Sequence, residues 1–277
     1  MPKNYIEYSF LVLPSDPWEE ILLAELQSLP FESFENSEGL LKAYVPEDLY
    51  YDSFIDSIDL LNNDKVTITF EKKIIEPINW NAKWESEFHP ILIGEDCVVR
   101  ADFHNPQEKK FELVINPKMS FGTGHHQTTF MMLSFALDED FIRKRVLDMG
   151  CGTGVLAILA SLKGAKRTDA IDNDPWCIEN TAENIQTNNC NNVYVSLAEL
   201  ISVSEPTYDI IFANINRNIL LEQIPSYYTA LKPKGFLFLS GFFEADISIL
   251  NECCQNEGLY LVDKKQKDSW RALKFVK

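Results

Sequence analysis

The sequence predicts an α/β protein in which a doubly wound sheet of mainly parallel strands follows a smaller α+β domain. From about residue 95 onward, short apolar runs alternate with segments of helical length, as in a parallel sheet covered by helices. Before residue 76, the runs follow the order strand, helix, strand, strand, helix, strand. We therefore expect domains at residues 1–76 and 93–277, joined by a linker helix at 77–92.

The composition excludes several classes of protein. With 277 residues, of which 45% are hydrophobic and 12% aromatic, the chain can fill two modest cores and is not disordered. It has no apolar stretch of about 20 residues and no secretory signal, so we expect a cytoplasmic protein without a membrane partner. The six cysteines show no CxxC spacing, which predicts reduced thiols and no metal site.

The charge of the chain indicates what it could bind. A net charge of −17 disfavours a nucleic-acid substrate, because binding to phosphates depends on Lys and Arg. A basic protein is the natural complement, although acidity that serves only solubility is an equally good interpretation. Residues 1–80 hold 16 acidic and 5 basic side chains, which makes the small domain the better candidate for docking a basic partner.

The elements of the small domain follow from alternation and helical periodicity. Asp16 and Pro17 are a typical cap and first residue of a helix. The predicted order is strand 6–13, helix 16–29, strands 31–36 and 39–45 joined by a hairpin, helix 46–61 and strand 65–75. This order is that of a ferredoxin-like module, a fold that carries many functions.

The linker helix would place Trp80, Trp84 and Phe88 on one face and end at Pro90. Such a face either packs against a domain or contacts a substrate, and packing is the more common use.

The large domain continues with strands and helices in alternation. Asp174 and Pro175 again mark the start of a helix. The predicted strands are 145–150, 168–174, 192–197, 208–215 and 235–242, followed by a C-terminal hairpin of 259–267 and 270–277. The predicted helices are 155–164, 174–189, 218–231 and 244–258.

The loop DMGCGTG joins the first of these strands to its helix. Gly150, Gly152 and Gly154 let the backbone turn tightly and come close to a ligand. Their spacing is GxGxG, which differs from the GxGxxG of dinucleotide-binding proteins, and no P-loop lysine follows. Asp172 ends the next strand, where a carboxylate can accept both hydroxyls of a ribose. The sequence thus predicts a pocket for a nucleoside rather than for a pyrophosphate.

Asp148, just before the loop, has two interpretations. It either anchors the backbone N–H groups of the glycine loop or faces the cationic end of a ligand. We favour the first, because Asp readily bonds to neighbouring backbone.

Three motifs together resemble a known family. The pair VLDMGCGTG (146–154) and AIDNDP (170–175) resembles the class I S-adenosylmethionine-dependent methyltransferases, which have a Rossmann-like sheet. With NPKMSFGTGHHQTTFMML (116–133) and DIIFANI (209–215), the chain resembles the ribosomal protein L11 methyltransferase family, PrmA. The resemblance implies transfer of methyl groups from S-adenosylmethionine to lysine ε-amines, and to the N-terminal amine, of ribosomal protein L11. The specific motifs of this resemblance lie within residues 78–277, so the expectation that residues 1–76 recognise the substrate rests on the acidity of that domain.

The same resemblance implies roles for particular residues. The cofactor-binding positions that it implies are Thr129, Gly150, Asp172 and Asn214, to which the glycine loop itself adds Gly152. From its place at the end of a strand, we expect the side-chain oxygen of Asn214, or the carbonyls of Ala213 and Ile215, to align the target amine, without a dedicated general base.

His126 stands where the family holds a histidine, and we expect it to hold its loop rather than to touch the substrate. We expect a monomer.

The residues themselves leave other functions open. A methyltransferase that acts on another protein amine or on a small molecule would carry the same loop. A non-catalytic protein that binds the cofactor is a further alternative, which the intact motifs disfavour. A nicotinamide-dependent dehydrogenase is disfavoured by the glycine spacing.

Overall fold

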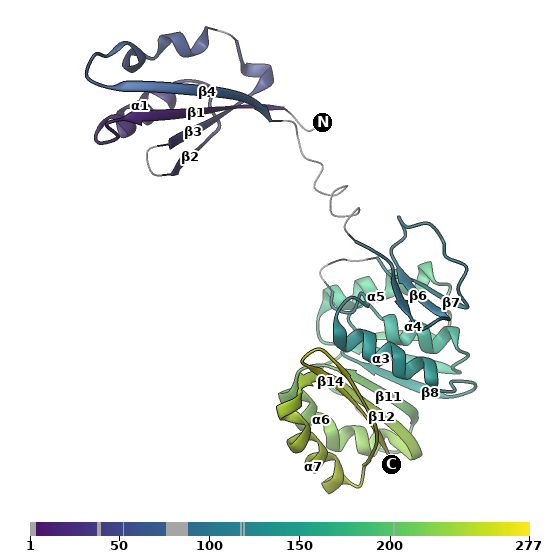
Figure 1. Ribbon diagram of the computed structural model, residues 1–277. Coiled ribbons are helices and arrows are strands. Elements are labelled where there is room, and N and C mark those ends of the chain that lie inside the picture. Colours follow the sequence, from purple (N-terminus) through teal and green to yellow (C-terminus); the bar gives the residue numbers. More distant parts are fainter. Residues whose placement is uncertain are drawn as a thin grey trace. The chain divides into compact units, whose positions relative to one another are not determined.

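The computed structural model describes residues 4–37, 40–51, 53–75, 88–116, 118, 120–201 and 203–277. The chain divides into two compact units, residues 1–87 and 88–277 (Figure 1). Each unit has a hydrophobic core of its own. Among the described residues, no helix has both the length and the apolar character needed to cross a membrane.

The first unit is a ferredoxin-like α+β domain, as the order of its elements predicts. Its regular elements are β1 (Tyr5–Leu13), α1 (Trp18–Leu26), β2 (Ser33–Ser37), β3 (Leu40–Pro46) and β4 (Thr67–Ile75). The strands form an antiparallel sheet in the order β2-β3-β1-β4. Alternate residues of β1, from Ile6 to Val12, are buried in one core with Leu22 and Leu26 of α1.

The predicted helix at 46–61 is wrong. The segment instead forms three short 3₁₀ turns, η1 (Glu47–Leu49), η2 (Phe54–Ser57) and η3 (Asp59–Asn62). Ser and Asp recur along this stretch, and their side chains compete for the backbone groups that a longer helix would pair.

The start of α1 also differs from the prediction. Pro17 occupies the cap position and α1 begins at Trp18, so Asp16 lies one residue too early to cap the helix.

The second unit is built on a seven-stranded sheet in the order β10-β9-β8-β11-β12-β14-β13. Its strands are β8 (Arg145–Met149), β9 (Arg167–Asp172), β10 (Val193–Leu197), β11 (Tyr208–Asn214), β12 (Leu231–Phe243), β13 (Tyr260–Lys267) and β14 (Trp270–Val276). Strands β8 to β12 pair in parallel, whereas the C-terminal hairpin joins β12 antiparallel. This arrangement confirms the predicted doubly wound sheet with a final hairpin.

Helices cover both faces of this sheet (Figure 1). They are α3 (Gln127–Asp138), α4 (Val155–Leu162), α5 (Pro175–Thr187), α6 (Arg217–Ala230) and α7 (Ile247–Glu257). One core joins α3 and α4 to Val146 and Phe212, and the other joins α6 and α7 to Leu147 and Ile211. Successive strand residues thus point to opposite cores, which explains why apolar residues stand next to one another in the central strands.

A second, three-stranded sheet was not predicted. It consists of β5 (Ile91–Ile93), β6 (Cys97–Arg100) and β7 (Phe111–Val114). Ile93, Cys97 and Leu113 are buried in the core that α3 and α4 also share. Residues 77–87 of the predicted linker helix, with Trp80 and Trp84, lie outside the described residues. Its last part was predicted wrongly, because 88–90 are not helical and β5 begins at Ile91.

Candidate functional site

The loop between β8 and α4 turns through three glycines with left-handed backbone. The φ angles of Gly150, Gly152 and Gly154 are +73°, +55° and +77°. The amides of Gly150 and Cys151 both donate to the carbonyl oxygen of Ile171, at 2.8 and 3.0 Å, and tie the loop to β9. Glycine adopts this run of conformations without the strain that a side chain would add.

Neighbouring segments of the chain also press against this loop. A Cβ atom built on Gly150 would lie 2.2 Å from Cγ2 of Ile215, and one built on Gly152 would lie 2.2 Å from the carbonyl oxygen of Phe121. Both distances are far shorter than van der Waals contact. The glycines therefore allow close packing of the protein's own chain, in addition to the approach of a ligand that the sequence suggests.

Asp172 is held rigidly at the carboxyl end of β9. Its side chain is 8% exposed. Oδ2 accepts a hydrogen bond from the amide of Gly152 at 2.9 Å, and Oδ1 accepts one from the amide of Asp174 at 3.0 Å. Each carboxylate oxygen keeps room for a further hydrogen bond, so this anchored group can still accept from a ligand hydroxyl.

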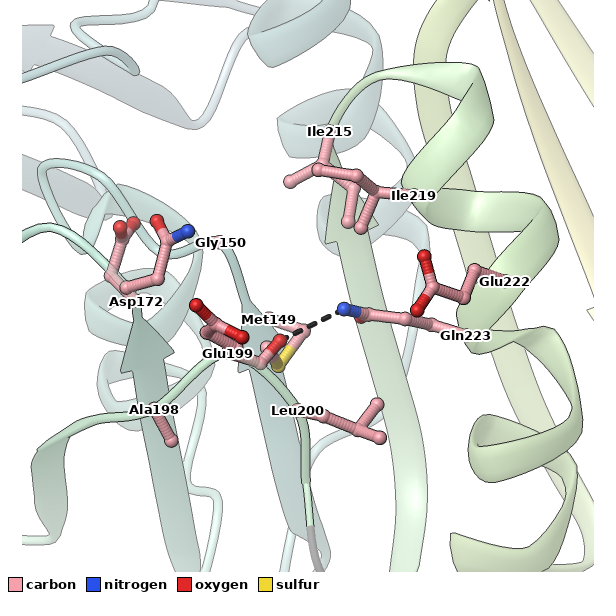
Figure 2. A pocket seen from close by; sticks show the side chains of 11 residues that line it. Met149, Gly150, Asp172, Ala198, Glu199, Leu200, Ile215, Ile219, Glu222 and Gln223 are labelled. Atoms are coloured by element: carbon pink, nitrogen blue, oxygen red, sulfur yellow. Dashed lines mark hydrogen bonds between the residues drawn. The ribbon is translucent and has the colours of Figure 1, made fainter.

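A cavity of about 400 Å³ opens at this edge of the sheet (Figure 2). It is lined by Met149, Gly150, Asp172, Asn173, Ala198, Glu199, Leu200, Ile215, Ile219, Glu222 and Gln223. The side chain of Gln223 in α6 crosses to the opposite wall and donates to the carbonyl oxygen of Glu199 at 2.8 Å. The cavity lies at the carboxyl ends of the strands next to the β8–β11 crossover, which is where ligands bind in open α/β sheets.

The segment before α3 is fastened onto the glycine loop. The amide of Thr153 donates to the carbonyl oxygen of Phe121 at 2.9 Å, and the Thr153 hydroxyl donates to that of Gly122 at 2.7 Å. The glycine-containing stretch at 121–124 therefore covers the loop through two hydrogen bonds to one threonine.

His126 caps α3. Its Nδ1 accepts from the amide of Thr128, and it also lies 2.8 Å from the Thr128 hydroxyl. Burial lowers the pKa of His126, which favours the neutral ring that can accept at Nδ1. His126 thus has a structural role as the cap of α3, and Thr129 lies inside this helix.

Thr129 and Asn214 lie side by side although 85 residues separate them. The Asn214 amide nitrogen donates to the Thr129 hydroxyl at 3.4 Å. The amide oxygen of Asn214 is buried and has no hydrogen-bond partner among the described residues. An unpaired buried acceptor is costly, so this oxygen is well suited to receive a hydrogen from a ligand.

Asp148 anchors the helix that follows the loop. Its Oδ2 accepts from the amide of Ala157, in the first turn of α4, at 3.1 Å. Burial raises the pKa of Asp148 to about 7, and the nearby carboxylate of Asp172 adds to this rise. Asp148 therefore does bond to backbone, but its partner is an amide of α4 and not one of the glycine loop that the sequence predicted.

Sequence reasoning missed three asparagines that brace the site. Asn180, Asn184 and Asn188 stand at intervals of four along α5, so they share one face of the helix. Asn184 donates to the Thr153 carbonyl at 2.9 Å and accepts from the Asn116 amide at 3.0 Å. The repeat of asparagine at positions i, i+4 and i+8 is the feature of the sequence that could have predicted a polar face on this helix.

Within the described residues, no group of three or more His, Cys, Asp or Glu side chains could hold a metal ion. The donor set at the cavity is instead of the kind that holds a nucleoside. It combines apolar walls such as Met149 and Ile219 with an anchored carboxylate at Asp172. A volume of about 400 Å³ falls in the usual range of small-molecule sites, roughly 300–1,000 Å³. The residues present therefore fit an adenosyl group.

Comparison with known proteins gives a consistent result. Residues 19–277 match the family model described as ribosomal protein L11 methyltransferase (PrmA). The chain is 42% identical to a ribosomal protein L11 methyltransferase of Porphyromonas gingivalis, over 99% of this chain and 98% of that protein. It is 39% identical to one from Bacteroides fragilis, over 99% of both chains.

Solved structures agree in fold. The crystal structure of a ribosomal protein L11 methylase from Lactobacillus delbrueckii subsp. bulgaricus superposes with a TM-score of 0.62 at 24% identity. The match covers 68% of this chain and 98% of that one. A methyltransferase from Pyrococcus furiosus reaches a TM-score of 0.50 at 19% identity, over 59% of this chain and 88% of that one.

Proposed function

The chain belongs to the ribosomal protein L11 methyltransferase family, and from this premise we propose that it methylates lysine ε-amines of ribosomal protein L11, with the N-terminal amine as a second target. S-adenosylmethionine supplies the methyl group, carried on a sulfonium that is already a good leaving group. The observation that carries the proposal is the cavity that places Gly150 beside the anchored carboxylate of Asp172.

We assign the binding of this donor to five residues. Asp172 accepts the ribose hydroxyls, and the backbone of Gly150 and Gly152 forms the floor against which the nucleoside lies. Thr129 and Asn214 border the site from α3 and from the end of β11.

Asn214 is the residue that we assign to alignment of the target amine. Its unpartnered amide oxygen can accept a hydrogen of the neutral amine and so fix the direction of the nitrogen lone pair. A lysine must first lose a proton, and removal from water lowers the pKa of an amine. Solvent takes this proton before transfer, so no dedicated general base is needed. Correct alignment of the two reactants can then account for about 7–11 kcal/mol of the barrier.

The small acidic domain, residues 1–76, is the proposed recognition module. Residues 1–80 carry 16 acidic and 5 basic side chains, which attract a basic ribosomal protein and speed its encounter. Glu7, Glu35 and Glu71 all lie on strands of its sheet. The linker at 77–92 would then join recognition to the catalytic domain at 93–277.

We place this reaction in the cytoplasm and expect the protein to act as a monomer. All six cysteines are free thiols, which suits a reducing compartment. The net charge of −17 opposes association of identical copies and binding to the phosphates of ribosomal RNA.

The test uses purified protein, S-adenosylmethionine and unmethylated ribosomal protein L11. With the wild-type enzyme, mass spectrometry of L11 should show mass increments of whole methyl groups that map to lysines. With the Asp172→Ala enzyme at low donor concentration, L11 should show no such increments. Methylation of other ribosomal proteins but not of L11 would contradict the substrate and leave a different protein amine as the target.

A further inference from the structure

A row of aromatic rings runs across the rim of the proposed transfer site. The ring centroids of Phe121 and His126 lie 5.0 Å apart, those of His126 and Trp270 lie 4.8 Å apart, and those of Trp270 and Phe243 lie 4.3 Å apart. These four residues come from the segment before α3, from β14 and from the end of β12. We call them the ring row.

The position of the ring row follows from the strand pairing. Asn214 pairs with Ser240 of β12, and Ser240 donates to the carbonyl oxygen of Arg271 at 2.8 Å. Trp270 pairs with Phe243, beyond these residues toward the carboxyl edge of β12. At its other end, the row reaches the glycine loop through the carbonyl of Phe121. The ring row therefore crosses the edge of the sheet at which Asn214 ends β11.

The ring row remains open to solvent. Phe121 is 52% exposed and Phe243 is 47% exposed, whereas His126 and Trp270 are partly buried. Two half-exposed phenyl rings at the ends of a row of touching rings leave apolar surface in water, and exposed aromatic surface of this kind often marks a binding site.

The charges of the chain favour a basic occupant. Aromatic faces attract cations, and they also pack well against methylene groups. The chain's own small domain is a poor occupant, because residues 1–80 carry 16 acidic and only 5 basic side chains. The cations beside the row are already paired, Arg271 with Glu244 and Arg217 with Asp246, so they do not repel a basic segment.

We propose that the ring row is the entry surface for the protein substrate, and that the methylenes of the target lysine and a neighbouring basic side chain pack on these rings. This inference rests on the proposed function and adds residues that select the substrate. These are positioning residues, because the reacting atoms lie deeper in the site. The ring row should therefore govern the KM for the protein substrate more than kcat or the affinity for the donor.

The test compares Phe243→Ala with Tyr260→Ala in the full-length protein. Both residues are exposed aromatics in or next to the C-terminal hairpin, but Tyr260 pairs with Val276 at the end far from Trp270. Phe243→Ala should raise the KM for ribosomal protein L11 by about five- to tenfold with kcat changed less than twofold. Tyr260→Ala should leave both values unchanged.

A calorimetric titration provides a readout without turnover. Unmethylated L11 should bind Phe243→Ala more weakly by the same factor, while S-adenosylhomocysteine binds both variants as it binds the wild type. An unaltered KM and affinity for L11 in Phe243→Ala would overturn this inference alone. Absence of methylation of any lysine-bearing protein by the wild type would overturn the proposed function as well.

Discussion

The amide nitrogen of Asn214 donates to the hydroxyl of Thr129 at 3.4 Å, and this bond leaves the amide oxygen of Asn214 as the free acceptor. An asparagine that gives its NH₂ group to a neighbour presents its carbonyl oxygen elsewhere, and here that oxygen is buried without a partner among the described residues. The pair joins the start of α3 to the end of β11, so two distant parts of the chain orient one acceptor.

We expect Asn214→Ala to lower kcat for L11 by about 10- to 1,000-fold, because the aligning acceptor is lost. Thr129→Val should lower kcat less, since it removes only the partner that orients Asn214, and Thr129→Ser should restore the rate. Steady-state kinetics of the three variants test this order. A Thr129→Val enzyme more impaired than Asn214→Ala would contradict it.

Gly150 and Gly94 form a matched pair of glycines. Both have positive φ, +73° and +62°, but a Cβ atom at Gly150 would lie 2.2 Å from Ile215, whereas one at Gly94 meets nothing within 4 Å. Gly94→Ala should therefore cost only the backbone strain, about 1–2 kcal/mol of unfolding free energy. Gly150→Ala should in addition abolish binding of S-adenosylmethionine, as measured by calorimetry. If Gly94→Ala and Gly150→Ala lowered the affinity for S-adenosylmethionine equally, backbone strain alone would explain the loss, and the close contact of Gly150 with Ile215 would have no role in binding.

Asp148 predicts a pH dependence of stability. Its pKa is about 7 in the folded protein and near 3.8 when the chain is unfolded, so the folded state binds the proton more tightly. The contribution of this group to stability is complete below about pH 4, falls as the pH rises to about 7, and is then constant. Asp148→Asn removes the buried charge and can keep an acceptor for Ala157.

The measurement is the unfolding free energy of both proteins between pH 5 and pH 8. The advantage of Asp148→Asn over the wild type should grow by up to about 3 kcal/mol across this pH range, since about two pH units separate pH 5 from the folded-state pKa. A constant or shrinking advantage would mean that Asp148 ionises at its ordinary pKa.

Asn184 predicts a coupled loss of stability and of donor binding. Its side chain is fully buried and satisfies the Thr153 carbonyl and the Asn116 amide. Asn184→Ala leaves both backbone groups unpaired, which costs about 2–4 kcal/mol, and it loosens the glycine loop. Gln186→Ala, at an exposed position of the same helix, should change neither property. The measurements are calorimetry for donor binding and thermal unfolding for stability. Normal donor affinity in Asn184→Ala would show that Asn184 does not support the glycine loop.

Local sequence patterns predicted the large domain well because its central strands are buried on both faces. Within 208–215, the residues from Ile210 to Ala213 are apolar and buried, and Asp174 with Pro175 begins α5 as expected. The glycine loop and Asp172 could also be recognised from the sequence. The left-handed turns of the loop require glycine, and the end of β9 requires a carboxylate as acceptor. They lie at a single cavity because parallel strands bring their carboxyl ends together.

Other features depend on contacts that a single sequence does not reveal. The short strands β5 to β7 have three or four residues each and are stabilised by packing on α3 and α4. Turns η1 to η3 show that apolar spacing alone does not make a helix where Ser and Asp compete for the backbone. The ring row joins residues as far apart as Phe121 and Trp270, and only the fold brings them together.

The most direct test of this account is the affinity for S-adenosylmethionine of the wild type and of Asp172→Ala, measured by isothermal titration. Asp172→Asn serves as a control, because it keeps an acceptor for the amide of Gly152. We predict that the wild type binds one donor molecule and that Asp172→Ala binds it about 10- to 100-fold more weakly, as expected when a charged hydrogen-bond acceptor is lost. Undiminished affinity in Asp172→Ala would contradict the proposal that this cavity holds the methyl donor.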